Sequence, residues 1–287
     1  MNLKNKKVLL VGLAKTGVST IKHLNRLGAK VVVNDIKDKD KLKDILDELS
    51  DLNKYMLVRL NDMVDECIPA YNEYRFGDIV TTLSSMLTTL MTNEFSSYYL
   101  DYTKDILYIE KTDDRARREV QTVLYTAVEV LAKLWAPILC HTTEEINSFM
   151  KFNETSIHLE SFKKLDLDFD TEKLREEMNV LFAVRKDVFK ALEEARANQL
   201  IGKSLEAHVL IHVDADTKAV IDKILDKPAQ WLIVSKVTFT DNELTQYESC
   251  QVQVEKANGH VCPRCWNYTE AEHEDGLCDR CHDVLTK

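Results

Sequence analysis

The spacing of hydrophobic positions changes near residue 50. Before that point, short apolar runs at 7–11 and 29–34 predict two buried parallel strands, and apolar residues between them recur at helical spacing. After that point, apolar residues follow the 3.6-residue period of amphipathic helices. The pattern predicts an N-terminal β-α-β unit followed by a mainly α-helical body.

The helical body contains four apolar stripes, which cover Met56–Cys67, Ile79–Tyr99, Val120–Trp135 and Leu174–Leu192. We expect the first break at Pro69 and Gly77. The run Thr142–Glu145 is typical of a capping box and predicts the start of a short helix. Side chains on the stripes are expected to form the core of a helix bundle.

Strand-like patterns return after residue 205. Residues 207–213 alternate between apolar and polar positions, and a short helix leading to Pro228 is followed by predicted strands at 231–239 and 251–254. We expect a small α/β module here. His208 and His212 share one face of the first strand and are expected to be surface residues rather than ligands, since no second cluster lies near them in sequence.

Composition agrees with long helices. The chain has only seven Gly and four Pro in 287 residues, which excludes collagen-like and Gly/Pro-rich all-β proteins. With 45% hydrophobic and 30% charged residues, it is not a disordered chain. It has no apolar run of 18 residues and no signal-peptide pattern, so we expect a cytoplasmic monomer without a membrane partner.

Charge divides the chain at the same place as the hydrophobic pattern. Residues 1–50 hold 11 Lys and Arg against 6 Asp and Glu, a net charge of +5. Of the 38 basic and 48 acidic residues in the whole chain, the rest therefore holds 27 and 42, a net charge of −15. This step predicts two pieces of different origin.

Four of the seven cysteines form a C-x2-C-x12-C-x2-C pattern: Cys262, Cys265, Cys278 and Cys281. Four thiolates at this spacing fill all positions of a tetrahedral zinc ion, which predicts one structural zinc rather than a catalytic one. Trp266 is a candidate to stack on a nucleotide base, with Arg264 and Arg280 at phosphates. The alternative is that Trp266 packs on the apolar surface of the small zinc fold.

A glycine turn follows the first predicted strand, with Gly12 and Gly17 at its ends. Val11–Gly17, together with Asp35 after the second strand, resembles the start of UDP-N-acetylmuramoyl-L-alanine:D-glutamate ligases. The resemblance implies that Gly12, Thr16 and Gly17 lie at the diphosphate of UDP and that Asp35 lies near the uracil. Alternatively, the glycines only permit a tight turn and close helix packing. No Gly-rich ATP loop follows at the expected place, so ligase activity is not expected.

From residue 51 onward, the chain resembles the anticodon-binding helices and the C-terminal zinc knuckle of isoleucyl-tRNA synthetases. The segments that carry this resemblance are Asn53–Asn61, Ala70–Phe76, Ser97–Tyr108, Arg117–Tyr125, Ala136–Ile146, Ser156–Leu159 and Ala191–Leu205. It implies binding of the isoleucine tRNA on the anticodon-stem side. The ATP-site signatures of that class, of the HIGH and KMSKS types, are absent, so we expect no aminoacylation.

A basic cluster of Arg115, Arg117 and Arg118 opens the third long helix. These guanidinium groups are candidates to contact tRNA phosphates. The alternative is a solvated helix face with local ion pairs. Lys104 is a similar case.

The predicted organisation has four parts: a β-α-β fragment at 1–50, a helical anticodon-binding domain at 51–165, a long helix with a small α/β module at 166–255, and a zinc knuckle at 256–287. Three functions are compatible with it. The chain is a tRNA-binding fragment without the catalytic and editing domains, a UDP-binding fragment acting through residues 8–35, or a fusion product without function.

Overall fold

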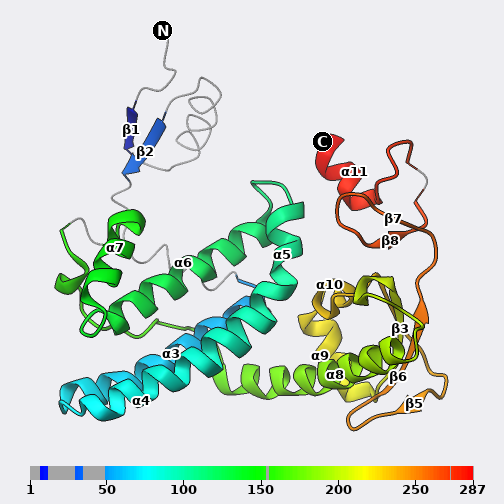
Figure 1. The fold of residues 1–287 in the computed structure, drawn as a ribbon, viewed down its shortest axis with the longest axis horizontal. Helices are drawn as coiled ribbons and strands as arrows, with labels where there is room; N and C mark the ends of the chain where they lie inside the picture. The colour runs from blue at the N-terminus through cyan, green and yellow to red at the C-terminus, as the bar shows by residue number, and fades with distance from the viewer. Residues whose placement is uncertain (1–6, 12–29, 35–48, 153–154, 272, 287) are drawn as a thin grey trace. The chain divides into compact units, whose positions relative to one another are not determined.

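The computed structural model describes residues 7–11, 30–34, 49–152, 155–271 and 273–286 (Figure 1). The chain forms two compact units. One comprises Met1–Leu49 with Asp166–Phe169, and the other comprises Ser50–Leu165 with Asp170–Lys287. The chain therefore passes from one unit to the other at Leu49–Ser50, where the hydrophobic pattern and the charge also change.

The first unit contains strands β1 (Lys7–Val11) and β2 (Lys30–Asn34). They pair in parallel with Lys7 opposite Lys30, as predicted. A parallel pair requires a crossover connection between its strands. Gly12, Thr16, Gly17 and Asp35 lie outside the described residues, as does the predicted helix.

The second unit is mostly helical, as predicted. Its helices are α3 (Asp51–Asn72), α4 (Phe76–Met86), the π-helix η1 (Leu87–Tyr99), α5 (Leu100–Ile109), α6 (Arg115–Trp135), α7 (Cys140–Met150), the 3-10 helix η2 (Ile157–Leu159), α8 (Thr171–Ala197), the 3-10 helix η3 (Ser204–Glu206), α9 (Ala215–Ile224), α10 (Pro228–Leu232) and α11 (Asp279–Thr286). Its strands are β3 (Ala207–His212), β4 (Lys236–Phe239), β5 (Thr245–Gln246), β6 (Gln251–Lys256), β7 (His260–Val261) and β8 (Tyr268–Thr269).

Helix α3 does not end at Pro69, contrary to the sequence-based expectation. Pro69 lies close to the C-terminal end, so its missing N–H removes one hydrogen bond from a helix that stops soon afterwards. Cys67 and Ala70 are buried on the face that packs into the bundle, and the Tyr71 hydroxyl donates to the carbonyl of Leu134 at 2.6 Å. Packing therefore holds the last turn in place.

The second apolar stripe, Ile79–Tyr99, lies in two helices, α4 and η1, rather than in one. The segment η1 is a π-helix of 13 residues between α4 and α5. Phe95 and Tyr99 are buried on it, and their rings meet edge to face. A bidentate ion pair joins its Glu94 to Arg59 of α3, with Nε to Oε2 at 2.8 Å and Nη2 to Oε1 at 2.9 Å. Tertiary contacts therefore support the wider turn.

The predicted capping box at Thr142–Glu145 is wrong. Helix α7 begins earlier, at Cys140, and the Thr143 hydroxyl donates to the carbonyl of Leu139 at 3.0 Å. The Glu144 carboxylate accepts hydrogen bonds from Ser156 Oγ at 2.9 Å and from the backbone N–H of Ile157 at 3.1 Å. These side chains connect α7 to the following loop instead of capping the helix.

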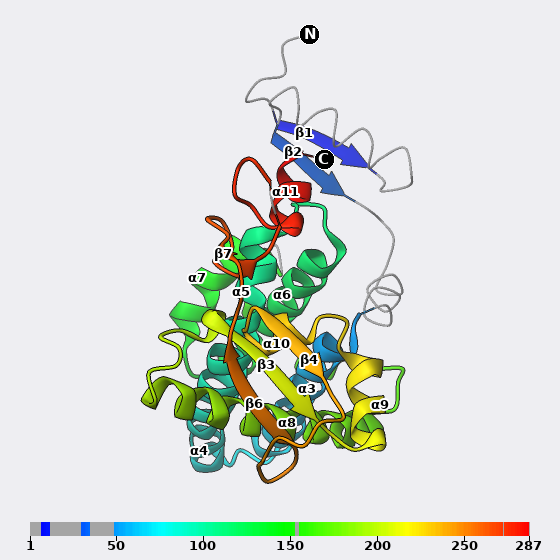
Figure 2. The ribbon, with the colours of Figure 1, turned by 90° about the vertical axis from the view of Figure 1, so that its right-hand side faces the viewer.

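The predicted α/β module contains a four-stranded sheet of order β4-β3-β6-β5 (Figure 2). Strand β3 is parallel to β4 and antiparallel to β6, and α8 packs against β6. Alternate residues of β3 are buried, which leaves His208 and His212 on the partly exposed face, as predicted. Trp231 was expected in a strand but lies in α10, where it is buried and donates from Nε1 to Tyr98 Oη at 3.0 Å.

In the part of the chain that the structure describes, no helix combines the length and apolar character needed to cross a lipid bilayer.

Candidate metal centre and nucleic-acid interface

The four-cysteine segment is a short hairpin followed by a terminal helix. Strands β7 and β8 pair antiparallel. Their turn is closed by hydrogen bonds from the N–H of Cys262 to Asn267 O and from the N–H of Trp266 to Cys262 O, both at 2.9 Å. Only glycine fits at Gly259, where φ is +89° and an added Cβ would lie 2.0 Å from the carbonyl oxygen of Thr269. The close approach of the two strands fixes the first cysteine pair.

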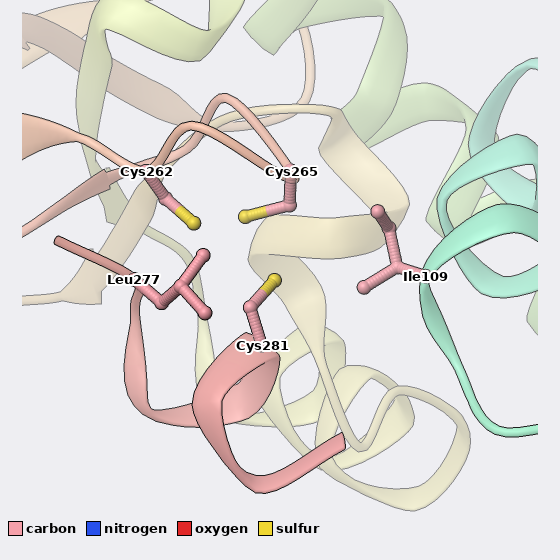
Figure 3. Packing of buried hydrophobic residues seen from close by; sticks show 5 residues of the cluster. All are labelled: Ile109, Cys262, Cys265, Leu277 and Cys281. Carbon is pink, nitrogen blue, oxygen red and sulfur yellow. The ribbon is translucent and has the colours of Figure 1, made fainter. Parts of the chain in front are cut away.

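The four predicted ligands come together. The Sγ atoms of Cys262, Cys265, Cys278 and Cys281 all lie within 4.8 Å of one another, and Figure 3 shows three of the thiols pointing toward a common centre. The sulfurs of Cys265 and Cys278 are 3.6 Å apart. Zn–S bonds of about 2.3 Å in a tetrahedron separate sulfurs by about 3.8 Å. The free thiols are therefore compatible with a zinc site.

Ionisation is uneven within this cluster. Burial raises the pKa of Cys262, but N–H groups of Cys265, Cys278 and Arg264 directed at its sulfur outweigh that effect and lower the pKa to about 6. Burial raises the pKa of Cys278 and of Cys281. Without a cation, the thiol of Cys262 therefore ionises first, and burial opposes ionisation of Cys278 and Cys281.

Two arginines of the knuckle anchor it to one face of α5. The Arg280 guanidinium binds the Asp105 carboxylate through two hydrogen bonds of 2.5 and 2.7 Å. Burial raises the pKa of Asp105, but the bonds from Arg280 and Gln230 outweigh it, and the pKa lies below its usual value. One turn further along the helix, Arg264 Nη2 donates to the carbonyl of Ile109 at 2.7 Å. The Ile109 side chain packs against the cysteine cluster.

A third arginine reaches the same end of α5. Arg117 Nη1 donates to the carbonyl of Glu110 at 3.0 Å, and the buried Glu110 carboxylate lies 3.6 Å from Arg280 and 3.7 Å from Lys227. The structure thus brings Arg117, Arg264 and Arg280 together around the α5–α6 turn. Each of them donates at least one hydrogen bond within the chain, whereas Nε of Arg117 is buried without a hydrogen-bond partner among the described residues.

A groove with a cavity volume of about 1060 Å³ lies between α5, the α10–β4 segment and the knuckle. Its apolar lining includes Ile233 and Phe239, and Tyr108 and Trp266 line it with 78% and 68% of their surface exposed. Lys104 of α5, with an exposed side chain, also lines it. Exposed aromatic rings beside an ammonium group are the features that bind unstacked nucleobases and phosphates.

The remaining predicted RNA contacts lie on α6 and in the groove. Arg115 is exposed and pairs with Glu119 at 2.8 Å, and the exposed Arg118 meets Gln121 Oε1 at 3.4 Å. Trp266 is exposed, so it does not pack inside the small four-cysteine fold. Sequence reasoning missed Tyr108, which lies on α5 next to the buried Ile109 and carries no local signal.

A family profile described as the anticodon-binding domain of tRNA ligase matches residues 53–211. This match continues beyond residue 165, where the sequence predicted a domain limit. The isoleucine–tRNA ligase of Lactobacillus helveticus is 39% identical over 247 residues, which cover 83% of this chain and 26% of the relative.

Two further isoleucine–tRNA ligases are similar. That of Latilactobacillus sakei is 37% identical over 269 residues, covering 90% of this chain and 29% of the relative, and that of Bacillus mycoides is 37% identical over 250 residues, covering 83% and 27%. Coverage of 90% includes part of the first fifty residues, so the likeness is not confined to residues 51–287. The chain spans about a quarter of the length of these relatives. The match over more than half of the chain shows that it belongs to the family of the anticodon-binding domain of tRNA ligases.

Proposed function

We propose that this chain binds tRNA, with the groove between α5, the α10–β4 segment and the knuckle as the main contact site. The observation that carries the proposal is the pair of exposed aromatic rings, Tyr108 and Trp266, in a groove of a chain from an anticodon-binding family. Bases of a single-stranded loop are unstacked and bind by stacking on such rings. Lys104 also lines the groove, where its ammonium group pairs with Asp101 at 3.1 Å and would exchange this partner for a phosphate.

The tRNA that we propose is the isoleucine tRNA, approached on its anticodon-stem side. The relatives are named isoleucine–tRNA ligases, and several of the segments that resemble this family lie on α3, α5 and α6. Residues 1–287 contain no ATP-site signature, so we propose tRNA binding without aminoacylation.

The predicted arginines divide into two groups under this proposal. Arg115 and Arg118 have exposed side chains at the start of α6 and would contact phosphates. Arg117, Arg264 and Arg280 already donate to groups around the end of α5. They would act by holding the groove in shape rather than by contacting RNA.

We further propose that Cys262, Cys265, Cys278 and Cys281 hold one structural zinc ion. The donor set supports this, because four converging thiols leave no open position for substrate. Zinc bound there would supply folding energy to a segment with little apolar core of its own.

We make a second, separate proposal for residues 1–50, which is that they bind UDP. The parallel pairing of β1 and β2 is the pairing that a nucleotide-binding β-α-β unit requires, and it supports UDP binding through Gly12, Thr16, Gly17 and Asp35. Titration of the protein with UDP by calorimetry tests it. Heat of binding that disappears in Asp35→Ala is expected, and no heat in the intact chain would contradict it.

The groove proposal is tested by replacing Trp266. Loss of one stacked base costs about 1–3 kcal/mol, so Trp266→Ala should weaken binding of the isoleucine tRNA about 5- to 150-fold in fluorescence anisotropy. Phe149→Ala is the matched control, because Phe149 on α7 is also an exposed aromatic residue but does not line the groove. Equal affinity of wild type and Trp266→Ala would contradict the groove as the binding site.

A further inference from the structure

The guanidinium of Arg264 connects two parts of the molecule that are far apart in sequence. Arg264 lies between the first two cysteines, and its Nη1 donates to Cys281 Sγ at 3.7 Å. Its Nη2 donates to the carbonyl of Ile109, the last residue of α5, at 2.7 Å. One planar group therefore contacts both the thiol cluster and the end of a helix of the bundle.

Both contacts satisfy groups that need a donor. A thiolate ligand is stabilised by N–H groups around it, and such outer contacts tune metal affinity. The last carbonyls of a helix have no partner within the helix and lie at its negative end, where a cation is favourable. The guanidinium holds its donors on separate nitrogens in a fixed fork and so reaches two acceptors that lie apart, whereas the three donors of a lysine ammonium all lie on one nitrogen.

Arg280 provides a natural comparison. It anchors the knuckle to the same face of α5 through Asp105, but the described contacts include no hydrogen bond from it to sulfur. Arg264 anchors the knuckle and also donates to sulfur. Both guanidinium groups lie near the thiols, since the charge of Arg280 interacts with Cys265, but of the two only Arg264 donates a hydrogen bond to sulfur among the described contacts.

We propose that Arg264 is a positioning residue that couples the four-thiolate centre to the C-terminal end of α5. The inference rests on the zinc site proposed above. Because Arg264, Cys265 and Ile109 also line the groove, the same contact fixes one wall of the groove relative to α5 whenever the thiolates hold their ion. Loss of the ion would release the end of α5 as well as the knuckle.

The test measures zinc release from the purified full chain to a chromophoric chelator. We expect Arg264→Ala to release zinc about 10- to 100-fold faster than wild type, the usual effect of losing an outer-shell partner. Arg264→Lys should show an intermediate rate, because one ammonium group replaces only one of the two contacts. Arg280→Ala, the matched control, should release zinc within about threefold of wild type.

A second measurement reports on the helix. Zinc removal should speed amide hydrogen exchange in the last turn of α5 in wild type, and it should have less effect in Arg264→Ala, where the end of α5 is already uncoupled. Equal zinc release by wild type and Arg264→Ala would overturn the role of Arg264, and so would equally fast release by Arg280→Ala. Metal analysis distinguishes failure of the Arg264 proposal from failure of the zinc site itself. If the zinc site fails, the purified wild-type chain would hold less than one zinc ion.

Discussion

At the scale of single residues, Arg185 on α8 is an exceptional side chain. It is 9% exposed, and its guanidinium carbon lies 4.1 Å from the ring centre of Phe189, 5.1 Å from that of Tyr98 and 5.5 Å from that of Trp231. Nε and Nη2 are buried and have no hydrogen-bond partner among the described residues. Burial lowers the pKa of Arg185. The aromatic faces, together with the nearby negative charge of Asp101, therefore compensate this buried cation.

Replacing Arg185 by methionine tests whether the cost of its unpaired buried donors exceeds the gain from its contacts with the aromatic rings. Two buried donors without partners cost about 1–3 kcal/mol each, whereas cation–π contacts at a desolvated site return about 2 kcal/mol. We expect the free energy of unfolding of Arg185→Met to equal that of wild type or to exceed it by about 1–2 kcal/mol. Urea denaturation measures the difference, with Arg185→Ala as a control that also loses packing. If Arg185→Met were less stable than wild type by more than about 1 kcal/mol, the cation–π contacts would outweigh the cost of the unpaired donors, contrary to this prediction.

At the scale of elements, the sequence predicts those helices and strands whose buried face follows a regular local period. Helix α8 and strand β3 match their predicted ranges closely, because each has one continuous buried face. The π-helix η1 was not predictable, since its support is the ion pair from Glu94 to Arg59, 35 residues earlier. The cysteine centre was predictable because its spacing is local. The groove was not, because its walls depend on the contact between Asp105 and Arg280, 175 residues apart.

Strand β3 carries a pH-dependent contribution to stability. Burial and the positive charge of Lys236 on β4 lower the pKa of His208, and Glu255 on β6 opposes them. A histidine whose pKa is lower in the folded state than in the unfolded state stabilises the fold fully above the unfolded value, about 6.5, and this contribution is lost as pH falls through the folded value.

The variant His208→Gln removes this titration and retains an amide that is able to bond Thr238, which lies 2.8 Å from His208 Nε2. We expect the melting temperature of wild type relative to His208→Gln to fall as pH is lowered from 7 to 5. Thermal unfolding across that range measures it. Parallel curves for the two proteins would show that His208 does not contribute.

At the scale of the whole molecule, the net charge of −10 limits non-specific attraction to nucleic acid. In the proposed tRNA complex, affinity would then come from stacking and from a few local cations. The exposed basic side chains Lys104, Arg115 and Arg118 lie on α5 and at the start of α6. One phosphate contact from each of these three side chains gives a slope of roughly −2 to −3 in a plot of log affinity against log salt.

A direct binding measurement tests whether this chain binds the isoleucine tRNA. Fluorescence anisotropy with the purified, zinc-loaded full chain would compare the isoleucine tRNA with a tRNA of another anticodon over a range of salt concentrations. We predict tighter binding of the isoleucine tRNA, with a salt slope of roughly −2 to −3. Equal binding of both tRNAs, or no binding of either, would contradict the account.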